Sequence, residues 1–297
     1  MRQTLLKATP LDASRIPVLD VAACLAGEPG ALEGAAAELR FALENVGFFY
    51  LAGHGVPQGL IDRIFAETRR FHALPLDHKT KLKLNRSNNG YMPLRGHAQR
   101  HTNLNKTPPK PNENESFFAK RERDPNDPDV IAGRDLRDPN QWPDDLPGFK
   151  ETVLEYQDMM RRLVHKLLPV YARALELPAD YFAPFFHKGG EITVRMIHYP
   201  PATQEQVADN VFGTAAHTDR NLFTILAQGD TPGLQIMLPT GPGFRRRSCP
   251  ACSSSILATR CAAGATTGSS RRRTGCSTSR AVTAIRCRFS CRPNTTR

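Results

Sequence analysis

The chain has 297 residues and a formal net charge of +11, and 40% of its residues are hydrophobic. This length allows one large domain or two smaller ones, and either can bury a core. No apolar run of roughly 18 residues occurs, which excludes a sequence pattern typical of membrane-spanning helices. The N-terminal segment lacks the apolar stretch and cleavage site of a secretory signal. We therefore expect a cytoplasmic protein with no membrane partner.

The positive charge is confined to the end of the chain. Twelve of the 40 Lys and Arg residues lie between Arg245 and Arg297, a segment without Lys, Asp or Glu. Residues 1–244 therefore hold 28 basic residues (40 minus 12) against 29 acidic ones, a net charge of −1. Six of the seven cysteines also lie in the basic segment, and Cys24 stands alone in the body. Two compositions meet near residue 241, so the overall charge is no evidence for a specific nucleic-acid partner.

The first part of the body predicts short strands and amphipathic helices. Residues 16–21 and 48–53 predict strands. Residues 31–47 have helical apolar spacing and stop at Gly47, a common helix end. Residues 57–74 predict a helix with one apolar face. That face consists of Leu60, Ile61, Ile64, Phe65 and Phe71.

The second part predicts one long helix followed by closely spaced strands. Residues 83–147 are rich in Asn, Pro and charge and predict mostly loop with short elements. Residues 147–177 predict the long helix, and residues 191–201, 221–230 and 233–238 predict strands. Helices followed by closely spaced strands favour an α+β fold in which an antiparallel β-core is backed by helices.

A short polar motif, His217-Thr218-Asp219, directly precedes one of these strands. Residues i and i+2 of a strand point to the same side, so the imidazole and the carboxylate can reach one ion together. Two His and one carboxylate, with open positions for other ligands, are typical of non-haem Fe(II) oxygenases. An ordinary polar pair at the start of a strand is the alternative, since so short a motif is common by chance.

Several segments elsewhere in the chain match one enzyme family, and they occur in the family's order. They are IPVLD (16–20), ALENVGFFYLAGHGVP (42–57), FHALPLDHKTKL (71–82), NNGYMPL (88–94), WPDDLPGF (142–149), VRMIHYPP (194–201) and HTDRNLFTILAQGDTPGLQI (217–236). On these motifs, residues 14–240 resemble the isopenicillin N synthase-like family of iron- and 2-oxoglutarate-dependent dioxygenases.

The resemblance implies a double-stranded β-helix, or jelly roll, with an N-terminal helical region. It implies an N-terminal non-haem dioxygenase region at 14–125, the start of the oxygenase domain at 147–240, and an aberrant tail at 241–297. It also implies that His217 and Asp219 are iron ligands. The expected cofactor is Fe(II), with 2-oxoglutarate as co-substrate and ascorbate as an optional addition, and the expected partners are O2 and a small-molecule substrate.

Tyr199 resembles a family tyrosine that hydrogen-bonds the co-substrate carboxylate. The usual Asn-Tyr-Tyr is here Ile197-His198-Tyr199, so packing of Tyr199 against the core is the alternative. His54 lies in Gly-His-Gly-Val-Pro, which the family uses as a structural turn, and we do not expect it to bind metal. Four other histidines are expected to be surface or packing residues. They are His72, His78, His165 and His187.

The last two site residues of the family are missing from the tail. The family has a third iron-binding His downstream of the His-x-Asp motif, and then an Arg-x-Ser whose guanidinium pairs with the far carboxylate of 2-oxoglutarate. Arg suits that role because its fork binds a carboxylate bidentately. No His follows His217, and the triplet Arg288-Phe289-Ser290 has the wrong neighbours. We therefore expect the C-terminal part of the β-core to be missing and the strands at 191–240 to lose sheet partners.

The genetic code offers an explanation for the tail. A second reading takes the last base of each codon with the first two bases of the next. From Ala251 onward the permitted codons can spell VLIVNLGDTLRRWSNDRFVS and then PPHRVLNLSGRDRYSLPFFLP, where several residues are permitted at some positions and the family-like one is chosen. The missing His then falls across Arg273 and Thr274, and the missing Arg across Thr283 and Ala284.

The sequence thus predicts that the tail is translated out of frame, beginning between about Gly241 and Cys249. Other interpretations of the tail are weaker. A zinc site at Cys249-x-x-Cys252 lacks a second Cys or His pair, disulfides lack a secretory context, and the arginine runs could contact phosphates non-specifically.

Other functions remain open. Within the family the alternatives are a ring-closing oxidase of the isopenicillin N synthase type and an ethylene- or succinate-forming oxidase. Outside it they are a non-catalytic remnant and a body with a basic tail that adheres to nucleic acid. The sequence does not predict the primary substrate, because no specificity pattern is readable in residues 83–147.

Overall fold

The computed structural model describes residues 16–96, 111–186, 190–201, 213–214 and 222–229, and only the backbone of Phe223 and of the strands beyond residue 233. The helices are α1 (Ala22–Ala26), α2 (Ala31–Asn45), α3 (Gln58–His72), α4 (Leu76–Lys81), α5 (Pro128–Ile131), α6 (Phe149–Ala174) and α7 (Ala183–Phe186). The strands are β1 (Val18–Asp20), β2 (Phe48–Ala52), β3 (Gly90–Met92), β4 (Glu115–Lys120), β5 (Glu191–Tyr199), β6 (Phe223–Gln228), β7 (Leu234–Thr240), β8 (Gly243–Ser248), β9 (Ile256–Arg260), β10 (Thr267–Ser269) and β11 (Arg280–Arg288).

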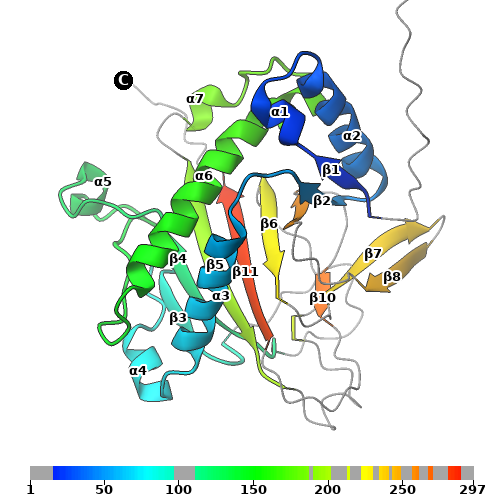
Figure 1. Ribbon diagram of the computed structural model, residues 1–297. Coiled ribbons are helices and arrows are strands. Elements are labelled where there is room, and N and C mark those ends of the chain that lie inside the picture. Colours follow the sequence, from blue (N-terminus) through cyan, green and yellow to red (C-terminus); the bar gives the residue numbers. More distant parts are fainter. Residues whose placement is uncertain are drawn as a thin grey trace, which may run out of the picture.

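The described strands form two sheets. The larger sheet has the order β1-β2-β9-β6-β11-β5-β4-β3, and the smaller has the order β10-β7-β8. β1 and β2 are parallel, and the other strand pairs within the two sheets are antiparallel. Figure 1 shows α3 and α6 lying across one face of the larger sheet, with β7 and β8 to one side of it. This arrangement confirms the predicted α+β class with a mainly antiparallel core.

Aromatic side chains fill the layer between these helices and the sheet. The ring of Phe71 on α3 lies 4.6 Å from that of Phe117 on β4 and 5.5 Å from that of Phe149 on α6. Tyr91 on β3 completes the group at 5.9 Å from Phe71. All four side chains are nearly inaccessible to solvent. Burial of large aromatic side chains is among the strongest contributions to a core, so this cluster fixes the helices on the sheet.

The predicted elements of the body are confirmed, with boundaries shifted by a few residues. α2 ends at Asn45, and Gly47 just beyond it has a φ of +79°, a conformation that favours glycine. The helix expected over 57–74 is α3, and the one expected over 147–177 is α6. The strands expected after them are β5, β6 and β7, but β6 and β7 belong to different sheets.

The strand β4 comes from the segment 83–147, where mostly loop was expected. It pairs with β5 along its whole length, from Glu115 opposite His198 to Lys120 opposite Thr193. A strand that pairs with a distant part of the chain is difficult to predict from its own residues alone. The N-terminal region therefore contributes part of the sheet that carries Tyr199.

The expectation that the tail leaves the core without partners is wrong for the strands that the structure describes. β11 pairs with both β5 and β6, and β9 pairs with both β2 and β6. Ladder hydrogen bonds join backbone groups, so a strand can occupy a sheet position whatever its overall composition. The β-branched residues Val282, Thr283 and Ile285 also favour an extended chain in β11.

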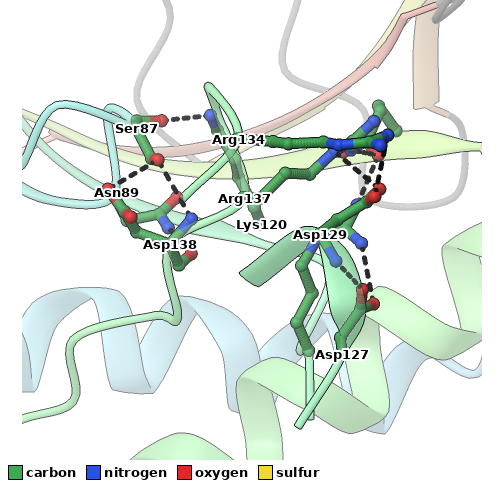
Figure 2. Close-up of polar contacts among 10 residues, drawn as sticks. Ser87, Asn89, Lys120, Asp127, Asp129, Arg134, Arg137 and Asp138 are labelled. Atoms are coloured by element: carbon green, nitrogen blue, oxygen red, sulfur yellow. Dashed lines mark hydrogen bonds and ion pairs between the residues drawn. The ribbon is translucent and has the colours of Figure 1, made fainter. Parts of the chain in front are cut away.

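Polar contacts hold the loop around α5 to the sheet (Figure 2). The Asp138 carboxylate accepts a hydrogen bond from Ser87 Oγ at 2.8 Å. Arg137 pairs with Asp129 at 3.7 Å and also with Glu191, the first residue of β5. These contacts tie the loop to the start of the strand that ends at Tyr199. No helix within the described ranges is both long and apolar enough to cross a membrane.

Candidate functional site

The side chains of β4 and β5 alternate between two sides of the larger sheet, one facing the helices and one facing away from them. Phe117 and Met196 lie opposite each other in register, and both belong to the core that packs against the helices. Because successive residues of a strand alternate between sides, Glu115 and His198 share this helix-facing side. The neighbouring residues of both strands, including Tyr199, lie on the opposite side.

A chain of hydrogen bonds runs along the opposite side. Arg195 donates from Nε to Ser116 Oγ at 3.0 Å and from Nη2 to Asn114 Oδ1 at 3.1 Å. Asn114 Nδ2 donates to Thr214 Oγ1 at 2.9 Å. The hydroxyl oxygens of Thr214 and Tyr199 lie 3.1 Å apart, within hydrogen-bond distance. All of these residues except Tyr199 are buried, so the hydroxyl of Tyr199 is held at the edge of a closed polar network.

Thr224 on β6 belongs to the same side as Tyr199. β11 lies between β5 and β6, and its residue Arg286 is opposite both Thr193 and Thr224 in register. Thr193 is separated from Tyr199 by an even number of positions, so both face the same way. The Thr224 hydroxyl is buried and has no hydrogen-bond partner among the described residues. A buried unpartnered hydroxyl is costly, which makes this position suited to a polar ligand.

The helix-facing side holds an ionic cluster around Glu115. The Glu115 carboxylate accepts from Lys79 Nζ at 3.0 Å and from the Tyr91 hydroxyl, and lies 2.7 Å from His198 Nδ1. Lys79 also donates to the carbonyl of His72 at 3.0 Å, and the rings of His72 and His198 are 5.3 Å apart. The side chains of Lys79 and Glu115 are 8% and 9% exposed. This is therefore a buried ion pair with most of its polar groups hydrogen-bonded.

The surroundings shift the pKa values of these groups. Burial alone would raise the pKa of Glu115, but hydrogen bonds from His198, Tyr91 and Lys79 outweigh burial and hold its pKa at about 2. Burial lowers the pKa of His72 to about 4, which keeps its ring neutral near pH 7. Burial, with the neighbouring carboxylate, raises the pKa of Tyr91. The cluster thus contains an ionised Glu115 beside a neutral His72.

Of the predicted site residues, the structure describes Tyr199, while His217 and Asp219 lie outside the described residues. Thr214, three positions before His217 in the sequence, is the described residue that links Tyr199 to this motif. Within the described parts of the chain, no group of three or more His, Cys, Asp or Glu side chains could hold a metal ion. The assignment of His217 and Asp219 as ligands stays a prediction.

His54, His72, His78 and His165, for which structural or surface roles were expected, have such roles in the structure. His54 Nδ1 accepts a hydrogen bond from the Val56 amide at 3.1 Å and so closes its own turn. A glycine is required beside it, because a Cβ at Gly53 would lie 2.8 Å from the Ala22 nitrogen. The remaining cases are His72 in the core, His78 paired with Asp145, and His165 packed edge-on against Phe186, while His187 is outside the described residues.

The sequence did not single out Asn114, Thr214 or Glu115. Asn114 and Glu115 belong to the Asn-rich segment 83–147, where no pattern pointed to a site. Asn114 meets Thr214 across 100 positions of sequence. Strict alternation along residues 114–118 could have placed these side chains on two sides of a strand, but only once the strand itself was known.

Comparison with known proteins identifies the family. Residues 16–145 match the family described as "non-haem dioxygenase in morphine synthesis N-terminal", and residues 191–258 match the 2OG-Fe(II) oxygenase superfamily. The 2-oxoglutarate-Fe(II) type oxidoreductase hxnY of Emericella nidulans is 32% identical over 76% of this chain and 64% of its own length. The proline hydroxylase buaE of Petromyces alliaceus is 31% identical over 76% of this chain and 68% of its own length. The chain thus spans less than two thirds of some of these relatives, hxnY among them.

Solved structures have the same fold. A full-length Neurospora crassa protein in complex with alpha-KG has a TM-score of 0.76 at 21% identity, over 93% of this chain and 85% of the Neurospora chain. The dioxygenase for auxin oxidation of rice has a TM-score of 0.66 at 24% identity, over 92% and 83%. At this identity the likeness concerns the fold, which in these oxygenases has a jelly-roll core. Together with the sequence matches, it follows that this chain belongs to the 2-oxoglutarate- and Fe(II)-dependent oxygenases, which use Fe(II) and 2-oxoglutarate.

Proposed function

We propose that this chain is built as a dioxygenase that oxidises a small molecule with Fe(II), 2-oxoglutarate and O2, and that it is impaired as written. His217 and Asp219 would hold the iron, and Tyr199 would orient the co-substrate. When bound, Fe(II) with 2-oxoglutarate supplies the oxidising power, and the co-substrate leaves as succinate and CO2. The observation that carries this proposal is the 3.1 Å contact between Tyr199 and Thr214, three positions before His217.

The residues present fit these groups in part. An imidazole and a carboxylate are donors suited to Fe(II). The hydroxyl of Tyr199 can hydrogen-bond a carboxylate, whereas Thr224 is opposite Arg286 of β11, six positions along that strand from Arg280, which is opposite Tyr199. The chain offers no His beyond His217 as a third ligand. Binding of the metal is therefore expected to be weak.

The out-of-frame hypothesis accounts for the missing donors. It puts the co-substrate Arg across Thr283 and Ala284 in the middle of β11, where Thr283 is opposite Met196 and Ala227, and Ala284 is opposite Arg195 and Leu226. A residue at this register position is between the two strands that carry Tyr199 and Thr224. Sequencing of the gene around codons 238–250 is the direct check of the frame.

Succinate release tests the function. Four proteins are compared under identical Fe(II), ascorbate and 2-oxoglutarate: the chain as written, a frame-restored chain, and the restored chain with His217→Ala or Asp219→Ala. We expect no succinate from the chain as written, uncoupled turnover from the restored chain, and loss of that turnover in both variants.

Two outcomes would contradict the proposal. Turnover by the chain as written that His217→Ala abolishes would show that another residue supplies the third ligand, so that the chain is not impaired. A restored chain that folds and binds Fe(II) but releases no succinate would favour a non-catalytic protein or an oxidase that does not use 2-oxoglutarate.

A further inference from the structure

Asn114 occupies a position that joins three separate parts of the chain. Its side-chain nitrogen donates to the Gly213 carbonyl at 2.7 Å and to Thr214 Oγ1 at 2.9 Å. Its side-chain oxygen accepts from Arg195 Nη2 at 3.1 Å. The amide thus joins its own segment before β4, the strand β5 through Arg195, and the segment that leads to His217. Thr214 of that last segment in turn contacts the hydroxyl of Tyr199 at the end of β5.

We propose that Asn114 is a positioning residue, which fixes Gly213 and Thr214, shortly before His217 in the sequence, relative to Tyr199. This inference rests on the proposed function for the identity of the ligands, but its structural part does not. Asn114 is fully buried and Thr214 is 5% exposed, so water does not substitute freely for these hydrogen bonds. A buried amide with both of its polar atoms engaged holds its partners in one arrangement.

The direction of the hydrogen bonds explains why the residue is an amide. The Gly213 carbonyl can only accept, and the Arg195 guanidinium can only donate. Asn presents two donors on one atom and an acceptor on the other, so it satisfies both neighbours at once. An aspartate would still accept from Arg195 but would have no hydrogen for the Gly213 carbonyl. Asn114→Asp therefore removes the hydrogen bond to the Gly213 carbonyl and keeps the one from Arg195.

The position in the chain is also informative. Asn114 lies within the N-terminal region matched at 16–145, whereas Gly213 and Thr214 lie within the oxygenase match at 191–258. On the other side of the same strand step, Glu115 meets His198, the neighbour of Tyr199. The consecutive residues Asn114 and Glu115 therefore contact β5 on opposite sides of the sheet, through Arg195 and His198 respectively. Asn114 also contacts Gly213 and Thr214, in the segment before His217.

Hydrogen–deuterium exchange on the full chain tests the structural part without any ligand. The variants are Asn114→Asp, which keeps the acceptor for Arg195 and removes the donors, and Thr214→Val, which keeps the shape and removes the hydroxyl. Both should make the amides of a peptide containing Gly213 and Thr214 exchange roughly tenfold faster, because a buried hydrogen bond is lost. Thr214→Ser, which restores the hydroxyl, should return exchange to the level of the parent chain.

Ser116→Ala is the matched control. Ser116 is equally buried, and its hydrogen bonds in the described part of the chain lead to Arg195 and Asn114 rather than to Gly213, Thr214 or Tyr199. The substitution also removes a buried hydrogen bond, and it should leave exchange at the peptide unchanged. If Asn114→Asp leaves exchange unchanged, or if Ser116→Ala accelerates it equally, Asn114 is an ordinary packing residue and the proposal is overturned.

Anaerobic binding of 2-oxoglutarate in the presence of Fe(II) tests the functional part. Loss of a residue that orients ligands typically weakens binding by about 10- to 100-fold, and we expect this for Asn114→Asp but not for Ser116→Ala. Equal affinities in the parent and in Asn114→Asp would refute the link to the ligands. The frame-restored chain is the parent protein in this binding experiment. If it binds neither group, the proposed function fails, and the exchange experiment alone decides on Asn114.

Discussion

The two sides of β4 and β5 stabilise polar groups in different ways. On the helix-facing side, the ionised Glu115 is surrounded by Lys79, Tyr91 and His198 inside a closed aromatic core. On the opposite side, the amide and hydroxyl groups of Asn114 and Thr214 lead to Tyr199 through neutral hydrogen bonds. Hydrogen bonds between neutral groups contribute about 1 kcal/mol each, whereas removal of one partner from a buried ion pair costs roughly 3–5 kcal/mol.

We therefore expect the side chains on the helix-facing side of β4 and β5 to contribute mainly to stability, and those on the opposite side mainly to ligand binding. The charged cluster can hold the strands together because it never has to open to solvent. On the opposite side, the hydrogen bonds that join the neutral groups of Asn114, Thr214 and Tyr199 contribute less stability each than the buried ion pair. Substitutions on the helix-facing side should therefore change the free energy of unfolding most, and substitutions on the opposite side should change ligand binding most.

The largest expected effect is that of Glu115→Gln. The substitution keeps the shape of the side chain but leaves the Lys79 ammonium without a carboxylate in a buried site. We expect the free energy of unfolding to fall by roughly 3–5 kcal/mol, measured by urea denaturation.

The double variant Glu115→Gln, Lys79→Met is the control for this prediction. It removes both charges together, so most of the lost stability should return. A single variant that loses less than about 1 kcal/mol would mean that the pair is hydrated in solution and resembles an exposed ion pair.

The second effect is a loss of stability in acid. The pKa of His72 is lowered from 6.5 to about 4 in the folded protein, so the unfolded chain binds more protons between these values. The contribution of a neutral His72 is complete above about pH 6.5 and is lost as the pH falls toward 4, by an amount on the order of 3 kcal/mol. Glu115, with a pKa of about 2 against 4.5, extends the loss from about pH 4.5 toward 2.

His72→Phe should flatten the upper part of this pH dependence, because the ring can no longer gain a proton. Its urea midpoint should then change little between pH 6.5 and 4, while the fall below pH 4.5 persists. Parallel curves for the parent chain and His72→Phe over the upper range would show that another group carries the acid sensitivity.

The sequence predicted the elements that can be recognised from the apolar spacing of their own side chains. α3 and α6 have apolar faces that repeat with the helical period, and both were found where that period predicted them. β4 has no such independence, because its place in the sheet depends on pairing with β5. β11 was mispredicted for a related reason: its partners β5 and β6 provide a ladder that composition alone does not reveal.

The sequence could select candidate site residues only where they are close in sequence or belong to a family motif, and the assignment of His217 and Asp219 stays a prediction. His217 and Asp219 were selected because two positions along a strand place both side chains on one side. Tyr199 followed from its family motif. Asn114 donates to Gly213 across 99 positions, and Glu115 reaches His198 across 83, so no spacing rule could join them. Such pairs become visible only when the register of the sheet is known.

The smallest expected effect on stability is that of Tyr199→Phe, and it is the most informative for the comparison of the two sides. The substitution keeps the ring and removes only the hydroxyl that lies 3.1 Å from Thr214 Oγ1. Because this bond joins neutral groups at a partly exposed position, the free energy of unfolding should fall by only about 0.5–1.5 kcal/mol. If Tyr199 orients the co-substrate, the affinity for 2-oxoglutarate in the frame-restored chain should nevertheless fall by roughly tenfold or more. Calorimetry and urea denaturation of the same preparation measure both quantities. A large loss of stability with unchanged affinity would reverse the assignment, and Tyr199 would then be a packing residue of the core.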